Sequence, residues 1–145
     1  MPATFDIPCG LATELLILEP LGPEHNAADY AAWTSSIEHI RATLGFAGRS
    51  WPRELSLQEN LDDLEAHAPD FGERVGFTYT VLDPADGEIV GCVYIYPARD
   101  DRHDARVSSW VRASRAELDV TLWEAVRDWL ASGWPFARID YAPRK

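Results

Sequence analysis

Residues whose side chains could bind a ligand or react form two unusual groups in this 145-residue chain. The first combines carboxylates with an imidazole within five positions: Asp100, Asp101, His103 and Asp104. Oxygen and nitrogen ligands of these kinds bind divalent cations. A solvated connecting loop explains the same residues more simply, and we therefore predict no metal site.

The second group is aromatic. Trp51 and Trp134 each precede a proline in a predicted loop. Such rings could line a pocket for a cationic amine, because an ammonium group is attracted to the face of an indole. Local packing of the Trp-Pro step is the simpler interpretation. Tyrosines also fall on predicted strands, where cross-strand packing explains them most simply: Tyr79, Tyr94, Tyr96 and Tyr141.

The first half of the chain is predicted to hold one strand and two helices. The strand is Glu14–Glu19, which a proline ends. Apolar residues over 30–44 recur at spacings of three and four, which indicates one continuous helix face. A second helix is predicted to begin at Ser56, because Ser56 and Glu59 have the spacing of a capping box. It ends or kinks near Ala68, before a proline.

Three strands are predicted next. Gly76–Leu82 alternates apolar and polar residues, as a strand does. Glu88–Tyr96 is a nearly continuous apolar run, which is typical of a central strand, and its Gly91 indicates a bulge or the close approach of another backbone. Ala105–Val111 completes a meander of three strands.

A helix and a short strand are predicted to follow the meander. Ser114 and Glu117 have capping-box spacing, so the helix should begin at Ser114, and Gly133 should end it. Ala137–Tyr141 is the last predicted strand. The resulting order, β-α-α-β-β-β-α-β, describes a single α+β domain over residues 1–145.

This order, and the runs of sequence that form it, resemble the GNAT N-acetyltransferase family over almost the whole chain. The runs are EPLGPEHNAADYAAWTSS, FTYTVLDP, IVGCVYIYP, WVRAS and WPFARIDY, in that order. The IVGCV strand has the hydrophobic-Gly-hydrophobic pattern that is usual in the family. The resemblance implies a central, mostly antiparallel mixed sheet flanked by helices. It also implies the transfer of an acetyl group from acetyl-CoA to an amine, either a small molecule or a peptide.

The resemblance also implies where the cofactor binds. It places a cleft where the strands Ala105–Val111 and Ala137–Tyr141 splay apart, with the pyrophosphate at the start of the following helix, where free amides and the helix dipole favour an anion. A backbone amide near Trp110–Arg112 would polarise the acetyl carbonyl, and Tyr141 would donate a proton to the leaving thiolate. The implied cofactor-binding residues are Trp110, Val111, Arg112, Ser114, Arg115 and Ala116.

The connection before the last helix departs from the family's glycine-rich cofactor loop, because it contains no glycine. Alignment with the family's motif puts Glu117 and Asp119 at glycine positions, where carboxylates would repel a diphosphate. Arg112 and Arg115 could neutralise that repulsion. A capping box of Ser114 and Glu117 would explain both residues without a ligand, and it would use amides that a phosphate needs.

The family usually continues with a helix and two strands after the strand that ends here at Tyr141, whereas this sequence stops at Lys145. An exposed sheet edge at this place would favour pairing with a second copy, so we expect a homodimer. Two functions stay open. One is an acetyltransferase, which we favour, and the other is a non-catalytic binding or dimerisation module that has lost the pyrophosphate loop.

The charge balance disfavours several classes of partner. The chain has 13 basic and 24 acidic residues, a net charge of −11, which argues against nucleic acid and anionic membrane surfaces and suits a cationic acceptor. Lys145 is the only lysine, so a phosphate-loop lysine and a Schiff-base lysine both lack a candidate. Without a signal-like or membrane-spanning segment, we expect a cytoplasmic protein. Cys9 and Cys92 lack zinc-site spacing, and whether they lie close together stays open.

Overall fold

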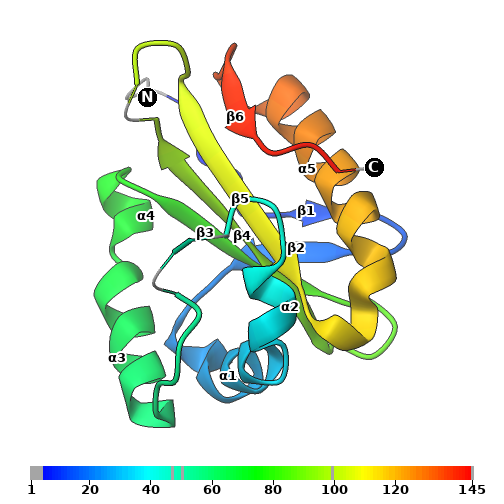
Figure 1. Ribbon diagram of the computed structural model, residues 1–145. Helices are drawn as coiled ribbons and strands as arrows, with labels where there is room; N and C mark the ends of the chain where they lie inside the picture. The colour runs from blue at the N-terminus through cyan, green and yellow to red at the C-terminus, as the bar shows by residue number, and fades with distance from the viewer. Residues whose placement is uncertain (1–4, 47, 50, 99, 145) are drawn as a thin grey trace.

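The computed structural model describes residues 5–46, 48–49, 51–98 and 100–144. Its centre is a six-stranded sheet in the order β1-β2-β3-β4-β5-β6 (Figure 1). Neighbouring strands are antiparallel except β5 and β6, which are parallel. The mostly antiparallel mixed sheet expected from the sequence is therefore confirmed. The strands are β1 (Leu11–Ala12), β2 (Ile17–Pro20), β3 (Phe77–Leu82), β4 (Ile89–Pro97), β5 (Ala105–Val111) and β6 (Ile139–Tyr141).

Helices flank the sheet on both sides, and α5 connects β5 to β6 (Figure 1). The α-helices are α1 (Asn26–Thr34), α2 (Ile37–Arg41), α3 (Leu57–His67), α4 (Asp70–Glu73) and α5 (Asp119–Gly133). Two 3-10 helices precede α1 and α5: η1 (Pro23–His25) and η2 (Ala113–Leu118).

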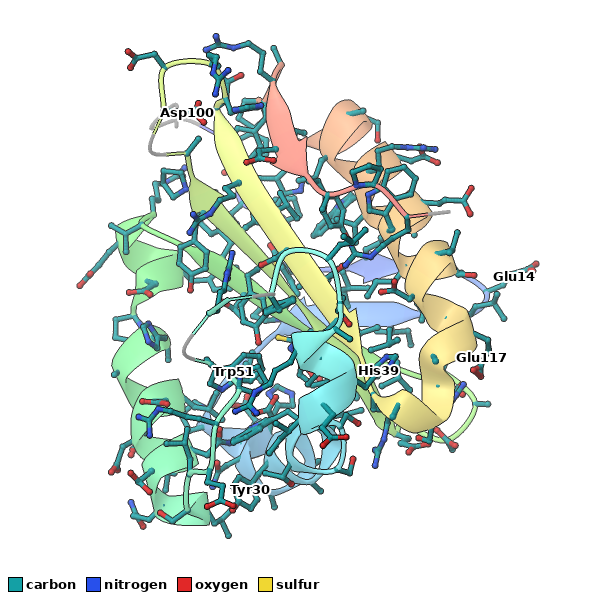
Figure 2. The ribbon with its side chains drawn as sticks, viewed as in Figure 1. Glu14, Tyr30, His39, Trp51, Asp100 and Glu117 are labelled. Atoms are coloured by element: carbon teal, nitrogen blue, oxygen red, sulfur yellow. The ribbon has the colours of Figure 1, made fainter. Side chains whose placement is uncertain are left out.

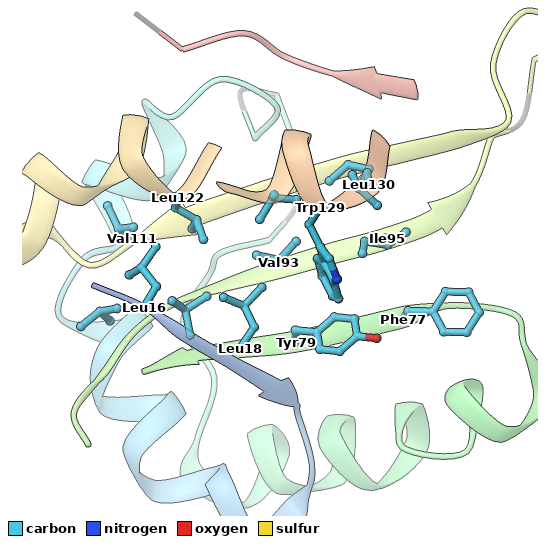
Figure 3. Close-up of a cluster of buried hydrophobic side chains, with 14 of the residues drawn as sticks. Leu16, Leu18, Phe77, Tyr79, Val93, Ile95, Val111, Leu122, Trp129 and Leu130 are labelled. Carbon is cyan, nitrogen blue, oxygen red and sulfur yellow. The ribbon is translucent and has the colours of Figure 1, made fainter. Parts of the chain in front are cut away.

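The core forms two layers, because successive side chains of a strand point to opposite faces of a sheet. Tyr79 and Val93 belong to the layer that packs against α5. Figure 3 shows Tyr79 beside Trp129 of α5, and the two rings make an edge contact with their centroids 5.1 Å apart. Trp110 faces the other side of the sheet and packs in a cluster with Trp33 of α1.

The helix expected over residues 30–44 is interrupted, which corrects the prediction of one continuous helix. Ser35 and Ser36 separate α1 from α2. The Ser35 hydroxyl donates to the Ala32 carbonyl oxygen at 2.9 Å, and serine side chains that bond to nearby backbone in this way compete with helix geometry. The Ser36 hydroxyl accepts a bond from Ala113 N at 2.8 Å, so the interruption is joined to the distant connection between β5 and α5.

The first predicted strand is also shorter than expected. β2 begins at Ile17 rather than at Glu14. Thr13 Oγ1 accepts a bond from Leu16 N at 3.0 Å, which closes a turn between β1 and β2. The structure therefore has a small hairpin where the sequence predicted one strand.

Two other local predictions are confirmed. Both bonds of the capping box at α3 are present: Ser56 Oγ accepts from Glu59 N at 3.1 Å, and Glu59 Oε1 accepts from Ser56 N at 2.9 Å. Gly91 lies where another backbone approaches closely, because a Cβ atom there would lie 2.2 Å from the Trp110 carbonyl oxygen.

The two cysteines are not joined: Cys9 is exposed, Cys92 is buried, and both thiols are free. Within the part of the chain that the structure describes, every helix is too short or too polar to cross a bilayer.

Candidate active site

The connection between β5 and α5 does not form the helix start that the sequence predicts. α5 begins at Asp119 rather than at Ser114, and the 3-10 helix η2 precedes it. Neither η2 nor α5 has a side-chain cap, so the predicted capping box of Ser114 and Glu117 is wrong. Arg115 has non-helical backbone angles, with φ −126° and ψ 33°. Its guanidinium group is bound to the turn between β3 and β4.

The two arginines of this connection form ion pairs with the turn between β3 and β4. Arg112 Nη1 lies 2.9 Å from Glu88 Oε1, and Arg115 Nη2 lies 2.7 Å from Asp83 Oδ2. Arg112 Nε is nevertheless buried without a hydrogen-bond partner among the described residues. A buried donor without an acceptor is unfavourable, but this atom has almost no exposed surface, so the side chain would have to move before it could bind an anion.

The other predicted cofactor residues are divided between the surface and the core. Ser114 and Ala116 are exposed on η2. Val111 is buried in the layer that faces α5. Trp110 is buried in the opposite layer, where its Nε1 donates to Tyr94 Oη at 3.0 Å. The side chains of Trp110 and Val111 therefore face opposite sides of the sheet and do not contact the same ligand. A cofactor that binds both residues would have to contact their backbone groups.

The pairing of β5 with β6 ends before β5 does. The last register pair is Val107 with Tyr141, and among the described residues no strand pairs with residues 108–111 on this side. We call these residues the unpaired edge of β5. It is the place where the resemblance implies a cofactor cleft.

Arg144, from the segment that follows β6, covers the unpaired edge. Its Nη2 donates to the Ser109 carbonyl oxygen at 2.9 Å, as the amide of a neighbouring strand would. Its Nε donates to Asp119 Oδ2 at 2.8 Å. The Arg144 side chain is 4% exposed, so the sequence-based expectation that Asp119 would repel a diphosphate omitted a buried partner of that carboxylate.

Glu117, the other acidic residue of that expectation, points into solvent with a side chain 69% exposed (Figure 2).

Tyr141 lies beside the same edge. Its Oη is 2.5 Å from Ser109 Oγ, and its ring is 6.1 Å from that of Trp123. Burial raises the pKa of Tyr141 to about 12, although the Ser109 bond and the Arg144 charge act in the opposite direction. The hydroxyl therefore keeps its proton at neutral pH, which a proton donor requires.

A large pocket lies on the opposite face of the sheet, between α1, α3, the connection from α2 to α3, and strands β4 and β5. Its volume is about 730 Å³, which is ample for a small molecule. Trp51 lines the pocket, with its ring centroid 5.5 Å from that of Trp33 and 6.3 Å from that of Tyr94, and Figure 2 shows it among the side chains between α3 and α1. Trp134 packs instead in the core, 5.4 Å from Trp129.

The inner end of the pocket holds a buried carboxylate. Asp29 is 5% exposed and accepts a bond from Asn60 Nδ2 at 3.2 Å. Asn60 Oδ1 accepts in turn from Trp33 Nε1 at 3.1 Å. Burial raises the pKa of Asp29 to about 6, although the Asn60 bond and the charge of His25 lower it. Asp29 is therefore a carboxylate that can exchange a proton near neutral pH.

Sequence reasoning missed the relation between the pocket and the unpaired edge. Ser108 lines the pocket, while the next residue, Ser109, binds Arg144 and Tyr141 on the other side. β5 is thus the wall between two candidate binding regions. The alternation of residues along Ala105–Val111 was a signal for two faces, but the sequence did not show which residues would gather on each.

The acidic loop before β5 has structural contacts that explain it. Asp100 Oδ1 accepts from His103 N at 2.8 Å. Asp104 Oδ2 accepts from Ala137 N and Arg138 N, each at 2.9 Å, which fixes the approach to β6. Among the residues described, no group of three potential ligands is placed to hold a metal ion.

Protein-family models and curated protein sequences give no match to this chain. Solved structures do match. A ribosomal-protein-S5-alanine acetyltransferase from Vibrio fischeri is 15% identical with a TM-score of 0.68, over 92% of this chain and 72% of that one. RimL, a ribosomal L7/L12 alpha-N-protein acetyltransferase in complex with CoA, is 13% identical with a TM-score of 0.65, over 86% and 65%. The microcin C7 self-immunity acetyltransferase MccE, in complex with acetyl-CoA and AMP, is 14% identical with a TM-score of 0.62, over 88% and 69%.

The chain spans about two thirds of the length of these acetyltransferases, and 64% of a further match from Vibrio cholerae. The identities are low, but the likeness covers most of this chain in each case. The shared features are a mixed sheet and helices that flank it. The chain therefore has the fold of the GNAT acetyltransferases.

Proposed function

We propose that the protein is an N-acetyltransferase that moves an acetyl group from acetyl-CoA to an amine held in the pocket. The observation that carries this proposal is the arrangement at Ser108 and Ser109. One strand separates a large pocket from an unpaired backbone edge, so an acceptor and a donor could approach it from opposite sides. CoA and acetyl-CoA are bound in structures of this fold, which supports the choice of donor.

The residues present fit acetyl-CoA if Arg144 leaves the unpaired edge. The Ser109 carbonyl oxygen would then be available to an amide of the pantetheine arm. Arg112, with its unpartnered Nε, would hold the pyrophosphate together with Arg115 and the exposed Ser114 hydroxyl. The bound cofactor supplies an acetyl thioester that an amine can attack.

The chain's own groups would prepare the amine and the proton transfers. The aromatic walls of the pocket, with Trp51 and Tyr94, stabilise an ammonium group. The Asp29 carboxylate lies in the same pocket with a pKa near neutrality, so it can take a proton from that group. On the other side of β5, Tyr141 keeps its proton and can donate it to a developing thiolate.

Calorimetry with acetyl-CoA tests the proposal, followed by an assay of CoA release with a thiol reagent and a set of amines. We expect binding, and we expect Arg115→Ala to weaken it at least tenfold if this residue holds the pyrophosphate. Arg102→Ala is the matched control, since Arg102 is an exposed arginine in the loop before β5. No binding at millimolar acetyl-CoA would refute the enzyme. Binding that ignores Arg115 would refute the placement of the pyrophosphate.

A non-catalytic binding module is the second candidate, and a specific observation favours it. Arg112 and Arg115 already have carboxylate partners, and Arg144 covers the edge that the cofactor would use. The pocket would then be the binding site of a protein that keeps the fold without the cofactor. A ligand that binds the pocket of a chain unable to bind acetyl-CoA would support this function.

The expected homodimer belongs to the same proposal. β6 is an edge strand of the described sheet, and its outer backbone groups could pair with a second copy. Light scattering at micromolar concentration measures the mass directly, and a monomer of 16.3 kDa would contradict the expectation.

A further inference from the structure

The outer part of the pocket has two cations without acidic partners. Arg49, from the connection between α2 and α3, and Arg106 of β5 both line the pocket. Arg49 lies over the Phe46 ring, with its guanidinium carbon 5.2 Å from the ring centroid. Within the described part of the chain, neither arginine makes an ion pair. Asp140 is the register neighbour of Arg106 on β6, but the two side chains do not form an ion pair.

These two cations act on each other. Burial lowers the pKa of Arg49, and the positive charge of Arg106 lowers it further. Two guanidinium groups that repel each other at one pocket are a favourable place for an anion. Such a pair of cations is unusual in a chain whose net charge is −11.

The other end of the pocket has the opposite charge. Asp29 of α1 and Asp63 of α3 line it, and Asp29 is close enough to Cys92 of β4 to help raise the pKa of that thiol. Arg106 pairs in register with Tyr96. Cys92 and Tyr96 are four residues apart on β4, about 13 Å along the strand, and Asp29 also acts on Tyr94 between them.

The wall between the two ends is aromatic. Tyr94 lies between Cys92 and Tyr96 on the same face of β4, and Phe46 and Trp51 pack around it with centroid distances of 6.1 and 6.3 Å. The pocket therefore brings together carboxylates, aromatic rings and a pair of guanidinium groups. Such a site complements a molecule with an ammonium group and an anion separated by an apolar middle.

We propose that the pocket binds a short peptide of two or three residues with both ends free. The terminal ammonium group lies towards Asp29, and the terminal carboxylate binds Arg49 and Arg106. A peptide of two or three residues fits within a pocket of about 730 Å³. A carboxylate suits a pair of guanidinium groups, because each can donate two parallel bonds to it. Acetylation of the ammonium end rests on the proposed function, whereas recognition of the two ends does not.

Calorimetry with matched peptides tests this recognition without any cofactor. The probes are Leu-Phe, its C-terminal amide, and its N-acetyl derivative. We expect Leu-Phe to bind at least tenfold more tightly than either blocked form, as the loss of a charged hydrogen-bond partner implies. Arg106→Gln and Arg49→Gln should each reduce the preference for Leu-Phe over its amide, while Arg102→Gln should keep it. Because Arg106 is exposed, we expect the variant to fold, and its thermal midpoint checks this.

Several results would overturn the proposal. These are no binding of Leu-Phe, equal binding of the acid and the amide by the unaltered protein, and a preference for the acid that persists in both Arg106→Gln and Arg49→Gln. Displacement of Leu-Phe by inorganic phosphate at a similar concentration would also overturn the choice of a carboxylate.

The test separates this inference from the proposed function. Selective binding of Leu-Phe without release of CoA from acetyl-CoA would refute the enzyme and leave the peptide site. CoA release with free and amidated peptides alike would refute the peptide site and leave the enzyme.

Discussion

Removal of Arg144 from the unpaired edge of β5 should increase the affinity for CoA. Arg144 bonds to the Ser109 carbonyl oxygen at 2.9 Å and to Asp119 Oδ2 at 2.8 Å. If the pantetheine arm needs the same backbone, these two bonds must break before the cofactor binds. The apparent dissociation constant is then raised by the reciprocal of the fraction of molecules in which the edge is open.

The size of this effect follows from the contacts. A hydrogen bond with a charged partner contributes about 1.5–3 kcal/mol. Two such bonds at the lower value hold the closed form by about 3 kcal/mol, so the open fraction is about 1%. On these lower values, removing Arg144 should therefore strengthen CoA binding by about 100-fold, and by less where the free edge is solvated.

The variant must also deal with Asp119. Arg144→Ala alone would leave a carboxylate without its partner near the position proposed for the pyrophosphate, and the repulsion would mask part of the gain. The double variant Arg144→Ala/Asp119→Asn removes both charges. Arg127→Ala is the matched control, because Arg127 is an α5 arginine with a half-exposed side chain over the Trp123 ring.

Isothermal calorimetry with CoA measures the change, and circular dichroism checks that each variant folds. We expect tighter binding by the double variant, an intermediate value for Arg144→Ala, and no change for Arg127→Ala. A folded double variant that binds CoA no better than the unaltered protein would refute the reasoning. In that case either the unpaired edge is not the cofactor site, or Arg144 takes part in binding.

Three further predictions concern the fold around the site. Gly91→Ala should destabilise the protein by about 1–3 kcal/mol in urea unfolding, because its Cβ would lie 2.2 Å from the Trp110 carbonyl oxygen; an unchanged midpoint would show that the strands can move apart. Asp29 binds its proton more tightly in the folded state, with a pKa of about 6 against 3.8, so it should lower stability as pH rises from 4 to 6, by up to about 3 kcal/mol. Asp29→Asn should remove that loss, and an equally steep pH dependence in the variant would contradict the assignment. Ser36→Ala should cost about 1 kcal/mol, since Ala113 N would lose its acceptor at 2.8 Å, and its hydrogen exchange should accelerate; a protected amide would refute the role of this bond.

The elements that could be predicted from the sequence are those decided by nearby residues. β5 was predicted with its bounds, because its apolar pattern is local and its neighbours are turns. The capping box at Ser56 was predicted for the same reason: its partner Glu59 lies three residues away. The fold followed from the order of such elements, which many residues determine together.

The errors have the opposite character. Ser114 and Glu117 have the spacing of a capping box, but Arg115 between them is drawn to Asp83, 32 residues away. The serines between α1 and α2 interrupt a regular apolar pattern, and Ser36 is bound 77 residues away. Spacing along the chain cannot reveal such partners. Trp51 was considered as a pocket residue, but the pocket as a whole was missed for this reason as well, since it gathers residues from α1, α3, α4, three strands and the connections between them.

The unusual acids of the β5–α5 connection now have a physical explanation. Without glycines, the backbone of η2 carries side chains where a phosphate would otherwise approach it closely. Asp119, at a position where the resemblance implies a glycine, is paired with Arg144, and the same side chain brings a guanidinium group onto the Ser109 carbonyl oxygen. The acid and the covering arginine are therefore one feature. A protein that lacked only the glycines would have a weak cofactor site. The Asp119–Arg144 pair would instead close the site unless cofactor binding supplies enough energy to displace Arg144. The affinity of the double variant separates these two cases, because charge removal restores binding to a closed site and cannot restore it to a lost one.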